Sequence, residues 1–134
     1  MIRGSKVSTQ PMKAMTVPKV RISDAALDPW PLPADWIETG SPQTSGAVLS
    51  KSADSRIVRG VWACTPGRFR WAFTYDETVV VVQGRATVIM ESGQEISLEP
   101  GVMAFFGRGQ ASTWIIHEDF RKAFHADSPE PLPF

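Results

Sequence analysis

The sequence predicts a single all-β domain within its 134 residues. From about residue 47 onward, short apolar segments recur at intervals of roughly 8 to 12 residues and are separated by turn-forming residues, a spacing typical of a β-sandwich or barrel. Between Phe69 and Tyr75 every second residue is aromatic, so one face of an extended segment carries the rings and should be buried. No segment has the pattern of a helix of ordinary length.

The chain before this domain divides into two parts. Residues 1–20 are basic, contain no acidic residue and show no periodicity, so they are predicted to be disordered. Residues 21–46 form a Pro-rich arm, in which the density of proline excludes helix interiors and central strands. The arm contains Trp30 and Trp36. Because tryptophan is seldom left in solvent, we expect the arm to pack on the outside of the domain or on a partner subunit.

The expected strands follow one another through the domain, residues 47–127, which is followed by a Pro-rich tail over residues 128–134. The continuous apolar segment Val79–Val82 fits a strand that is covered on both faces. A polar residue and a glycine, Ser92-Gly93, stand between two alternating segments and predict a hairpin. The expected strands span residues 47–49, 56–64, 69–75, 79–82, 85–91, 94–99, 102–106, 111–117 and 120–125.

Composition and charge exclude several classes of protein. Hydrophobic residues make up 43% and charged residues 21% of the chain, as in ordinary globular proteins. Fourteen basic residues balance fourteen acidic ones, so no nucleic-acid partner is expected, and no apolar segment approaches the roughly 20 residues of a membrane span. The single cysteine, Cys64, excludes an intramolecular disulfide and is expected to be a small buried strand residue. With no export signal evident, we predict a cytoplasmic location.

Several short motifs of residues 60–122 resemble those of a known family. The matching pieces are Gly60-x-Trp62, Thr65-Pro66-Gly67, Asp76-Glu77 followed by Gly84-Arg85, Glu99-Pro100-Gly101, Trp114 and Arg121-Lys122. In this order and spacing they resemble the small cupins related to (S)-ureidoglycine aminohydrolase and to the ethanolamine-utilization cupin. The resemblance implies an RmlC-like jelly-roll barrel with its site in the barrel mouth, commonly as a homodimer. It also implies manganese in the aminohydrolase relatives, whereas the ethanolamine-utilization relatives are short of metal-binding histidines.

The metal-binding histidines of such cupins are missing from this chain. Carried over by position, Trp71 and Phe73 replace the first two histidines and Ser112 replaces the third, so that Glu77 alone remains. Manganese or iron needs several imidazole or carboxylate ligands, which these residues do not supply. We therefore expect neither a metal nor a cofactor. The two histidines of the chain, His117 and His125, are expected at the surface or the rim.

Glu77 and Lys122 are the charged residues of the candidate site. Glu77 continues the alternation of Trp71 and Tyr75, so it should point into an aromatic interior, where a carboxylate suits acid–base catalysis or binding of a cation. The alternative is a structural carboxylate held by backbone amides or by a lysine. Lys122, which lies between apolar neighbours, is the candidate partner, unless it extends to the surface; a separation beyond about 6 Å would end the pairing hypothesis.

The remaining candidate ligand-binding residues are aromatic or small. Ser112 and Trp114 share one strand face, and together with Trp71, Phe73 and Tyr75 they are predicted to line a cavity, unless the rings fill the core completely. The predicted function is a metal-independent cupin that binds a small molecule in the barrel mouth near Glu77. Two alternatives stay open. One is a cupin enzyme, aminohydrolase-like or lyase-like, that acts on a small nitrogenous metabolite with Glu77 as the catalytic residue; the other is a non-catalytic dimeric interaction or regulatory module.

Overall fold

The computed structural model describes residues 16–134, so residues 1–15 of the segment predicted to be disordered lie outside the described residues. The described chain consists of strands and two short 3-10 helices, η1 (Ile22–Asp24) and η2 (Ala34–Trp36). The strands are β1 (Asp28–Pro29), β2 (Ile37–Gly40), β3 (Thr44–Lys51), β4 (Ile57–Cys64), β5 (Gly67–Ala72), β6 (Asp76–Gln83), β7 (Ala86–Met90), β8 (Glu95–Leu98), β9 (Met103–Phe106), β10 (Ala111–Ile116) and β11 (Phe120–Asp127). The prediction of an all-β domain is confirmed. No helix in residues 16–134 is long and apolar enough to cross a membrane.

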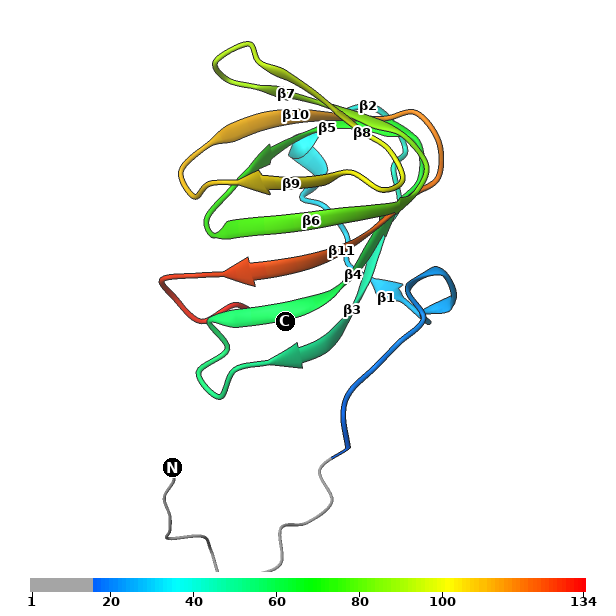
Figure 1. Ribbon diagram of the computed structural model, residues 1–134. Coiled ribbons are helices and arrows are strands. Elements are labelled where there is room, and N and C mark those ends of the chain that lie inside the picture. Colours follow the sequence, from blue (N-terminus) through cyan, green and yellow to red (C-terminus); the bar gives the residue numbers. More distant parts are fainter. Residues whose placement is uncertain (1–15) are drawn as a thin grey trace, which may run out of the picture.

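The strands form two antiparallel sheets, with the orders β1-β3-β4-β11-β6-β9 and β2-β5-β10-β7-β8. In Figure 1 the five-stranded sheet lies at the top of the view, and the six-stranded sheet runs down from β9 to β3. The last strand, β11, lies between β4 and β6. This long-range pairing brings the end of the domain next to the strand that carries Glu77, so residues far apart in the sequence share one interior.

The core lies between the sheets and consists of every second residue of the strands. Buried residues alternate with less buried ones along β6, β10 and β11, as the period-two geometry of a strand requires. Phe69, Phe120 and Leu98 are among the largest fully buried side chains. Cys64 is buried as expected, and this burial raises the pKa of its thiol to about 12.

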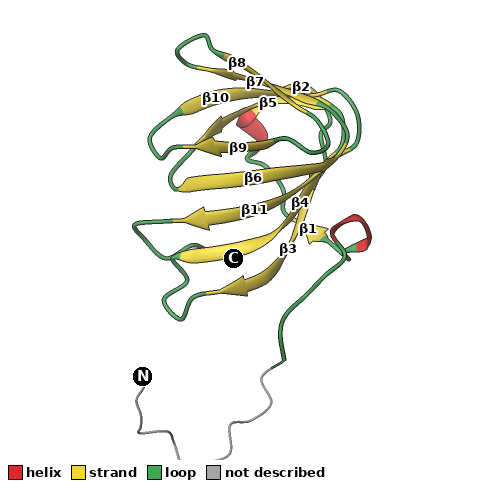
Figure 2. Cartoon of the chain, in the orientation of Figure 1, coloured by secondary structure: helices red, strands yellow, loops and turns green. Residues whose placement is uncertain are grey.

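Each strand predicted from the sequence has a counterpart, but the arm differs from the expectation. β3 begins at Thr44, before the predicted domain boundary at residue 47, and the arm itself contributes β1 and β2. Both of these additional strands lie at the edge of a sheet. An edge strand tolerates proline because one side of its backbone needs no ladder partner, and β1 ends in Pro29. Figure 2 shows that most of the remaining arm is loop.

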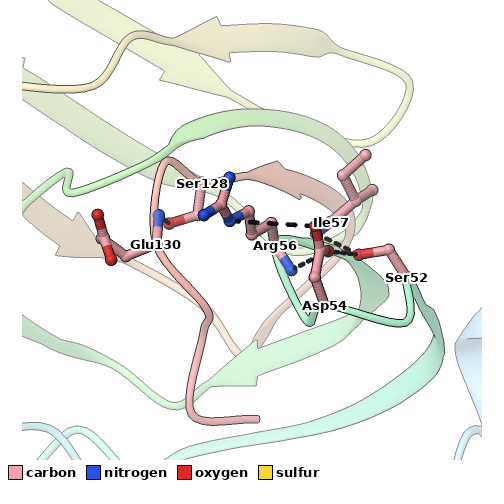
Figure 3. Close-up of polar contacts among 6 residues, drawn as sticks. All are labelled: Ser52, Asp54, Arg56, Ile57, Ser128 and Glu130. Atoms are coloured by element: carbon pink, nitrogen blue, oxygen red, sulfur yellow. Dashed lines mark hydrogen bonds and ion pairs between the residues drawn. The ribbon is translucent and has the colours of Figure 1, made fainter.

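The turn between β3 and β4 is stabilised by side-chain hydrogen bonds, shown in Figure 3. Ser52 Oγ donates to Asp54 Oδ1 (2.7 Å) and accepts from the backbone N–H of Ile57 (3.0 Å). The N–H of Arg56 donates to Asp54 Oδ1 (3.1 Å). The Ser52 hydroxyl, followed by the Arg56 N–H, lowers the pKa of the Asp54 carboxyl. These contacts give the turn a defined conformation.

The same turn anchors the C-terminal tail. The N–H of Ser128 donates to the carbonyl of Arg56 (2.8 Å), and the N–H of Leu132 donates to the carbonyl of Ser55 (2.8 Å). Within the tail, the Glu130 N–H donates to Ser128 Oγ (3.2 Å; Figure 3). Because the tail is attached at these points, the last residue of the chain is directed back toward the arm.

Candidate functional site

A cavity of about 410 Å³ lies inside the domain at the end covered by the arm. Its walls are almost entirely aromatic or aliphatic, and its charged residues are Glu77 and Lys122. The lining residues are Pro29, Trp30, Pro31, Leu32, Pro33, Trp36, Trp62, Phe69, Trp71, Tyr75, Glu77, Trp114, Lys122, Phe124 and Phe134. A concave apolar space with a few polar groups is the usual composition of a small-molecule site, and its volume lies within the range of such sites.

Glu77 and Lys122 form an ion pair on the cavity wall. Lys122 Nζ donates a hydrogen bond to Glu77 Oε2 across 2.6 Å, and the two side chains are 6% and 5% exposed, respectively. The pairing suggested by the sequence is therefore present. Among the described residues, no hydrogen bond is made by the second carboxylate oxygen, Oε1. The pair thus places an acceptor and an ammonium donor side by side at the edge of an apolar space.

Two tryptophan rings surround the ammonium group. Lys122 Nζ lies 4.7 Å from the centre of the Trp62 ring and 4.9 Å from that of Trp114, both within the 6 Å range of a cation–π contact. The two rings contact each other edge to face, with their centres 5.9 Å apart. The indole Nε1 of Trp114 is the one buried side-chain polar atom of residues 16–134 without a hydrogen-bond partner. A donor of this kind costs about 1–3 kcal/mol when it stays unpaired.

Tyr75 supplies a further polar group to the cavity. The residue is buried at the turn between β5 and β6, and its ring belongs to the core. Burial raises the pKa of the phenol well above its usual value, and the nearby Glu77 carboxylate raises it further. The hydroxyl therefore keeps its proton over the whole physiological range and is available to the site as a neutral hydrogen-bonding group.

The arm forms the outer wall of the cavity. Trp36, at the end of η2 beside β5, contacts Trp71 edge to face with ring centres 5.5 Å apart. Trp30 stacks on Phe134, the last residue, at 4.9 Å and 17°. The sequence predicts that the arm packs on the outside of the domain or on a partner subunit, and in the structure residues 29–33 and Trp36 line the cavity of the domain itself. Their rings complete an apolar space that the sheets leave open.

Backbone contacts and a glycine hold Trp30 in this position. The Trp30 N–H donates to the Thr44 carbonyl (3.0 Å), and the Thr44 hydroxyl donates to the Trp30 carbonyl. The six-membered part of the indole lies directly over Gly46, where a Cβ atom would approach the ring to 2.2 Å. Any larger residue at position 46 would therefore displace the ring. Lys51 Nζ also donates to the carbonyl of Phe134 (3.0 Å) and holds the stacking partner.

The structure brings together most, but not all, of the residues predicted for the site. Trp71, Tyr75, Glu77, Trp114 and Lys122 line the cavity. The other two predicted residues do not, as described next. The residues that the prediction omitted are Trp62, Phe69, Phe124, Phe134 and the arm from Pro29 to Trp36. The two tryptophans of the arm were the available signal, since they required a covering surface, but alternation within strands does not show where an arm packs.

Phe73 and Ser112 were expected in the cavity and lie outside its lining. The Phe73 ring stacks on Phe106 at 4.9 Å and 5°, so it packs within the core. Ser112 Oγ donates to the backbone carbonyl of Trp71 on the neighbouring strand (2.9 Å), which occupies the hydroxyl in a sheet contact. Alternation correctly predicted that both side chains are buried, but it does not give their position along the barrel, and both lie outside the cavity lining.

The residues present do not fit the manganese site that the resemblance to (S)-ureidoglycine aminohydrolase implies. No group of three or more His, Cys, Asp or Glu residues that could hold a metal ion occurs in the part of the chain that the structure describes. Glu77 is bound to Lys122, and rings occupy the two preceding ligand positions. His117 is exposed, and its ring forms a hydrogen bond with Thr87 Oγ1 (2.9 Å). His125 is one of the less buried residues that alternate with the inward-facing residues of β11.

Part of the sequence matches the profile of a known protein family. The profile of the EutQ-like cupin domain matches residues 51–124. No curated protein sequence matches the chain.

Solved structures share the fold. A protein of unknown function from the DUF861 family of Pseudomonas syringae pv. tomato has a TM-score of 0.71 at 23% identity, over 77% of this chain and 45% of that one. The EutQ protein of Clostridium difficile has a TM-score of 0.59 at 22% identity, over 71% and 77% of the two chains. A putative ethanolamine utilization protein Q of Salmonella typhimurium gives 0.57 and 22%, over 63% and 69%. The chain thus spans less than half the length of the Pseudomonas protein.

Proposed function

The chain belongs to the EutQ-like cupin domain family, and we propose that it binds a small organic molecule in the cavity beside Glu77 without using a metal ion. The observation that carries this proposal is the cavity itself. A purely structural barrel would be filled by its own rings, whereas here about 410 Å³ stays open next to a buried ion pair. Burying charges costs free energy that apolar residues of the same size would not require. A charged pair at the wall of an open cavity is also in a position to contact a ligand.

Two polar groups support ligand binding. Glu77 contributes a carboxylate oxygen without a hydrogen bond to any described residue, and Tyr75 contributes a protonated hydroxyl. Both residues line the cavity. A few polar groups within an apolar wall orient a ligand, while the aromatic faces supply most of the buried area.

A screen of small molecules by thermal shift tests the proposal, with a matched pair of variants. Trp71 lines the cavity on β5, and Arg70, its neighbour in sequence, is exposed on the opposite face of the strand. We expect a ligand that raises the melting temperature of the wild type to lose this effect in Trp71→Ala and to keep it in Arg70→Ala. A ligand that stabilises both variants equally would bind elsewhere and contradict the proposed site.

A cupin enzyme that acts on a small nitrogenous metabolite is the second candidate, and the position of Glu77 favours it. A carboxylate that borders a cavity with one oxygen unbonded is available to take a proton from a bound molecule. The test is to incubate each ligand found in the screen with wild type and with Glu77→Gln, and to follow its mass. Conversion by the wild type alone supports catalysis; no conversion of any ligand favours binding without turnover.

A homodimer is the assembly that we propose. β9 is an edge strand of the six-stranded sheet, and its Met103 and Phe105 side chains are 70% and 64% exposed. Antiparallel pairing of β9 with β9 of a second copy is compatible with twofold symmetry. Such pairing would give the free backbone groups of both edge strands hydrogen-bond partners, and it would cover Met103 and Phe105 of both copies. We therefore expect the dimer contact at β9 and not at the arm, because the arm covers the cavity of its own chain. The cytoplasmic location stays a prediction from the sequence.

A further inference from the structure

We propose that Trp62, Trp114 and Glu77 form an ammonium-binding site that the chain fills with its own Lys122, and that the adjoining cavity therefore takes uncharged planar ligands. The ammonium site is inferred from the geometry of the four residues alone. The inference about the ligand class rests on the proposed binding function.

The arrangement around Lys122 Nζ has the composition of a site for an organic cation. Two indole rings approach the same nitrogen at 4.7 and 4.9 Å, at an interplanar angle of 68°, and a carboxylate oxygen lies 2.6 Å away. Aromatic faces together with an acid are what proteins use to bind ammonium ligands from solution. Here the cation is covalently attached, and it reaches the site along the interior from β11.

The tethered ammonium is next to open space rather than enclosed by the core. Trp62, Trp114, Glu77 and Lys122 all line the cavity. A ligand of suitable size could therefore reach the position of Nζ if the lysine head group were absent. This accessibility separates the arrangement from an ordinary buried ion pair, whose removal would leave a closed void.

Occupation by Lys122 determines which ligands the wild-type cavity accepts. A second cation would meet the ammonium charge, or would have to displace it and leave a buried lysine without its acid. An anion would lose its hydration among proline and aromatic side chains and would meet Glu77, while the Lys122 charge is already balanced. An uncharged molecule avoids both costs. The aromatic rings of Trp30, Trp36 and Trp71, which also border the cavity, favour a planar one.

The first experiment measures tetramethylammonium binding to wild type and to Lys122→Met by tryptophan fluorescence and thermal shift. Methionine keeps an unbranched apolar chain and removes the charge. We expect binding to the variant to be stronger than to the wild type by at least about tenfold, since a desolvated cation–π site contributes of that order.

The neutral control tert-butanol should not distinguish the two proteins, and Glu77→Gln/Lys122→Met should lose the gain in tetramethylammonium binding. Equal binding of tetramethylammonium to wild type and a folded Lys122→Met would overturn the proposal.

A second variant covers the case in which Lys122→Met does not fold. Lys122→Ala lacks the atoms of one n-propylammonium ion, so we expect n-propylammonium to raise its yield of folded protein and its melting temperature, whereas n-propanol should not. Equal effects of the two additives would contradict an ammonium site.

A series of isosteric ligands tests the ligand class. Benzamide, benzamidinium and benzoate have nearly the same shape and carry no charge, a positive charge and a negative charge. We expect benzamide to bind the wild type best, and benzamidinium to become the preferred ligand in Lys122→Met. If no ligand of any kind binds the wild type while tetramethylammonium binds the variant, the proposed function fails and the ammonium site stands. If the wild type prefers benzamidinium, the inference about the ligand class fails although the binding function holds.

Discussion

Glu77 and Lys122 form their ion pair although strand register places them in different rows of the sheet. Glu77 lies opposite Ala126, and Lys122, four residues earlier on β11, lies opposite Val81. The intervening row is Val79 and Phe124. The two side chains must therefore extend toward each other along the interior, and their 2.6 Å contact forms beside the cavity. This offset makes the pair dependent on both strands and on both full-length side chains.

The first prediction concerns the stability of this pair. We expect Glu77→Leu and Lys122→Met each to lower the free energy of unfolding by about 3–5 kcal/mol, because each leaves a buried charge without its partner. Urea denaturation measures the change. The double variant Glu77→Leu/Lys122→Met removes both charges and should recover much of the loss, since replacing a whole buried pair by apolar residues is often neutral. Additive losses in the double variant would show that the two groups do not interact.

The second prediction concerns Gly46 and the position of the arm. A Cβ atom at residue 46 would approach the Trp30 ring to 2.2 Å, so Gly46→Ala should displace the ring and cost about 1–3 kcal/mol of stability. A red shift in tryptophan emission would report the displaced indole. The control is the Trp30→Ala background, in which no ring stands over residue 46. There Gly46→Ala should cost much less, and an unchanged cost would place the strain elsewhere.

The third prediction is a loss of stability at alkaline pH. Burial raises the pKa of Cys64 from its ordinary 9.0 to about 12, so above pH 9 the unfolded chain releases a proton that the folded chain retains. The free energy of unfolding should then fall by about 1.4 kcal/mol per pH unit as the pH rises from 9 toward 12. Tyr75, whose pKa is also raised by burial, should add a second decrease above its ordinary value of 10.0.

Urea denaturation of wild type and Cys64→Ala between pH 8 and pH 10 isolates the contribution of the thiol. We expect the variant to be nearly flat over the interval in which the wild type begins to lose stability. Parallel curves for the two proteins would mean that groups other than Cys64 govern this range. As a companion measurement, a thiol reagent should modify Cys64 slowly in the folded protein and quickly in urea, because the reactive form is the thiolate.

The fourth prediction concerns assembly through β9. Light scattering should give the wild type a mass of twice the 14.8 kDa of the chain. Phe105→Glu introduces a charge on the exposed apolar pair and should give monomers without loss of the fold, because the side chain is 64% exposed. Arg70→Glu, an exposed change on the other sheet, is the control and should stay dimeric. A monomeric wild type would refute the proposed assembly.

The strands and the inward direction of Glu77 were predictable because they depend on local geometry. Alternation with a period of two follows from the extended backbone, so the aromatic residues from Phe69 to Tyr75 indicated which side of the chain is buried. The same reasoning made Lys122 a candidate partner, because its neighbours on the strand are apolar. The sequence also gives the chemical type of each candidate residue. Trp71 and Phe73 stand at positions where related cupins have metal-binding histidines, and aromatic rings cannot act as metal ligands.

Other features depended on how distant segments pack. Parity assigns a side chain to a face but does not give its depth along the barrel, so it did not separate Tyr75, which lines the cavity, from Phe73, which stacks on Phe106. It also contained no information about a segment without regular alternation, and the arm that completes the cavity is such a segment.

The sequence by itself determined the strands of the domain from residue 47 onward and the chemical character of the interior, because backbone periodicity and side-chain type are properties of neighbouring residues. The tertiary structure alone decided that Trp30 and Phe134, from near the two ends of the described chain, stack at one rim of the cavity. It also decided that Lys122 lies between two tryptophans that come from different sheets. Strand order and the packing of the two sheets, which no local pattern encodes, bring these residues together.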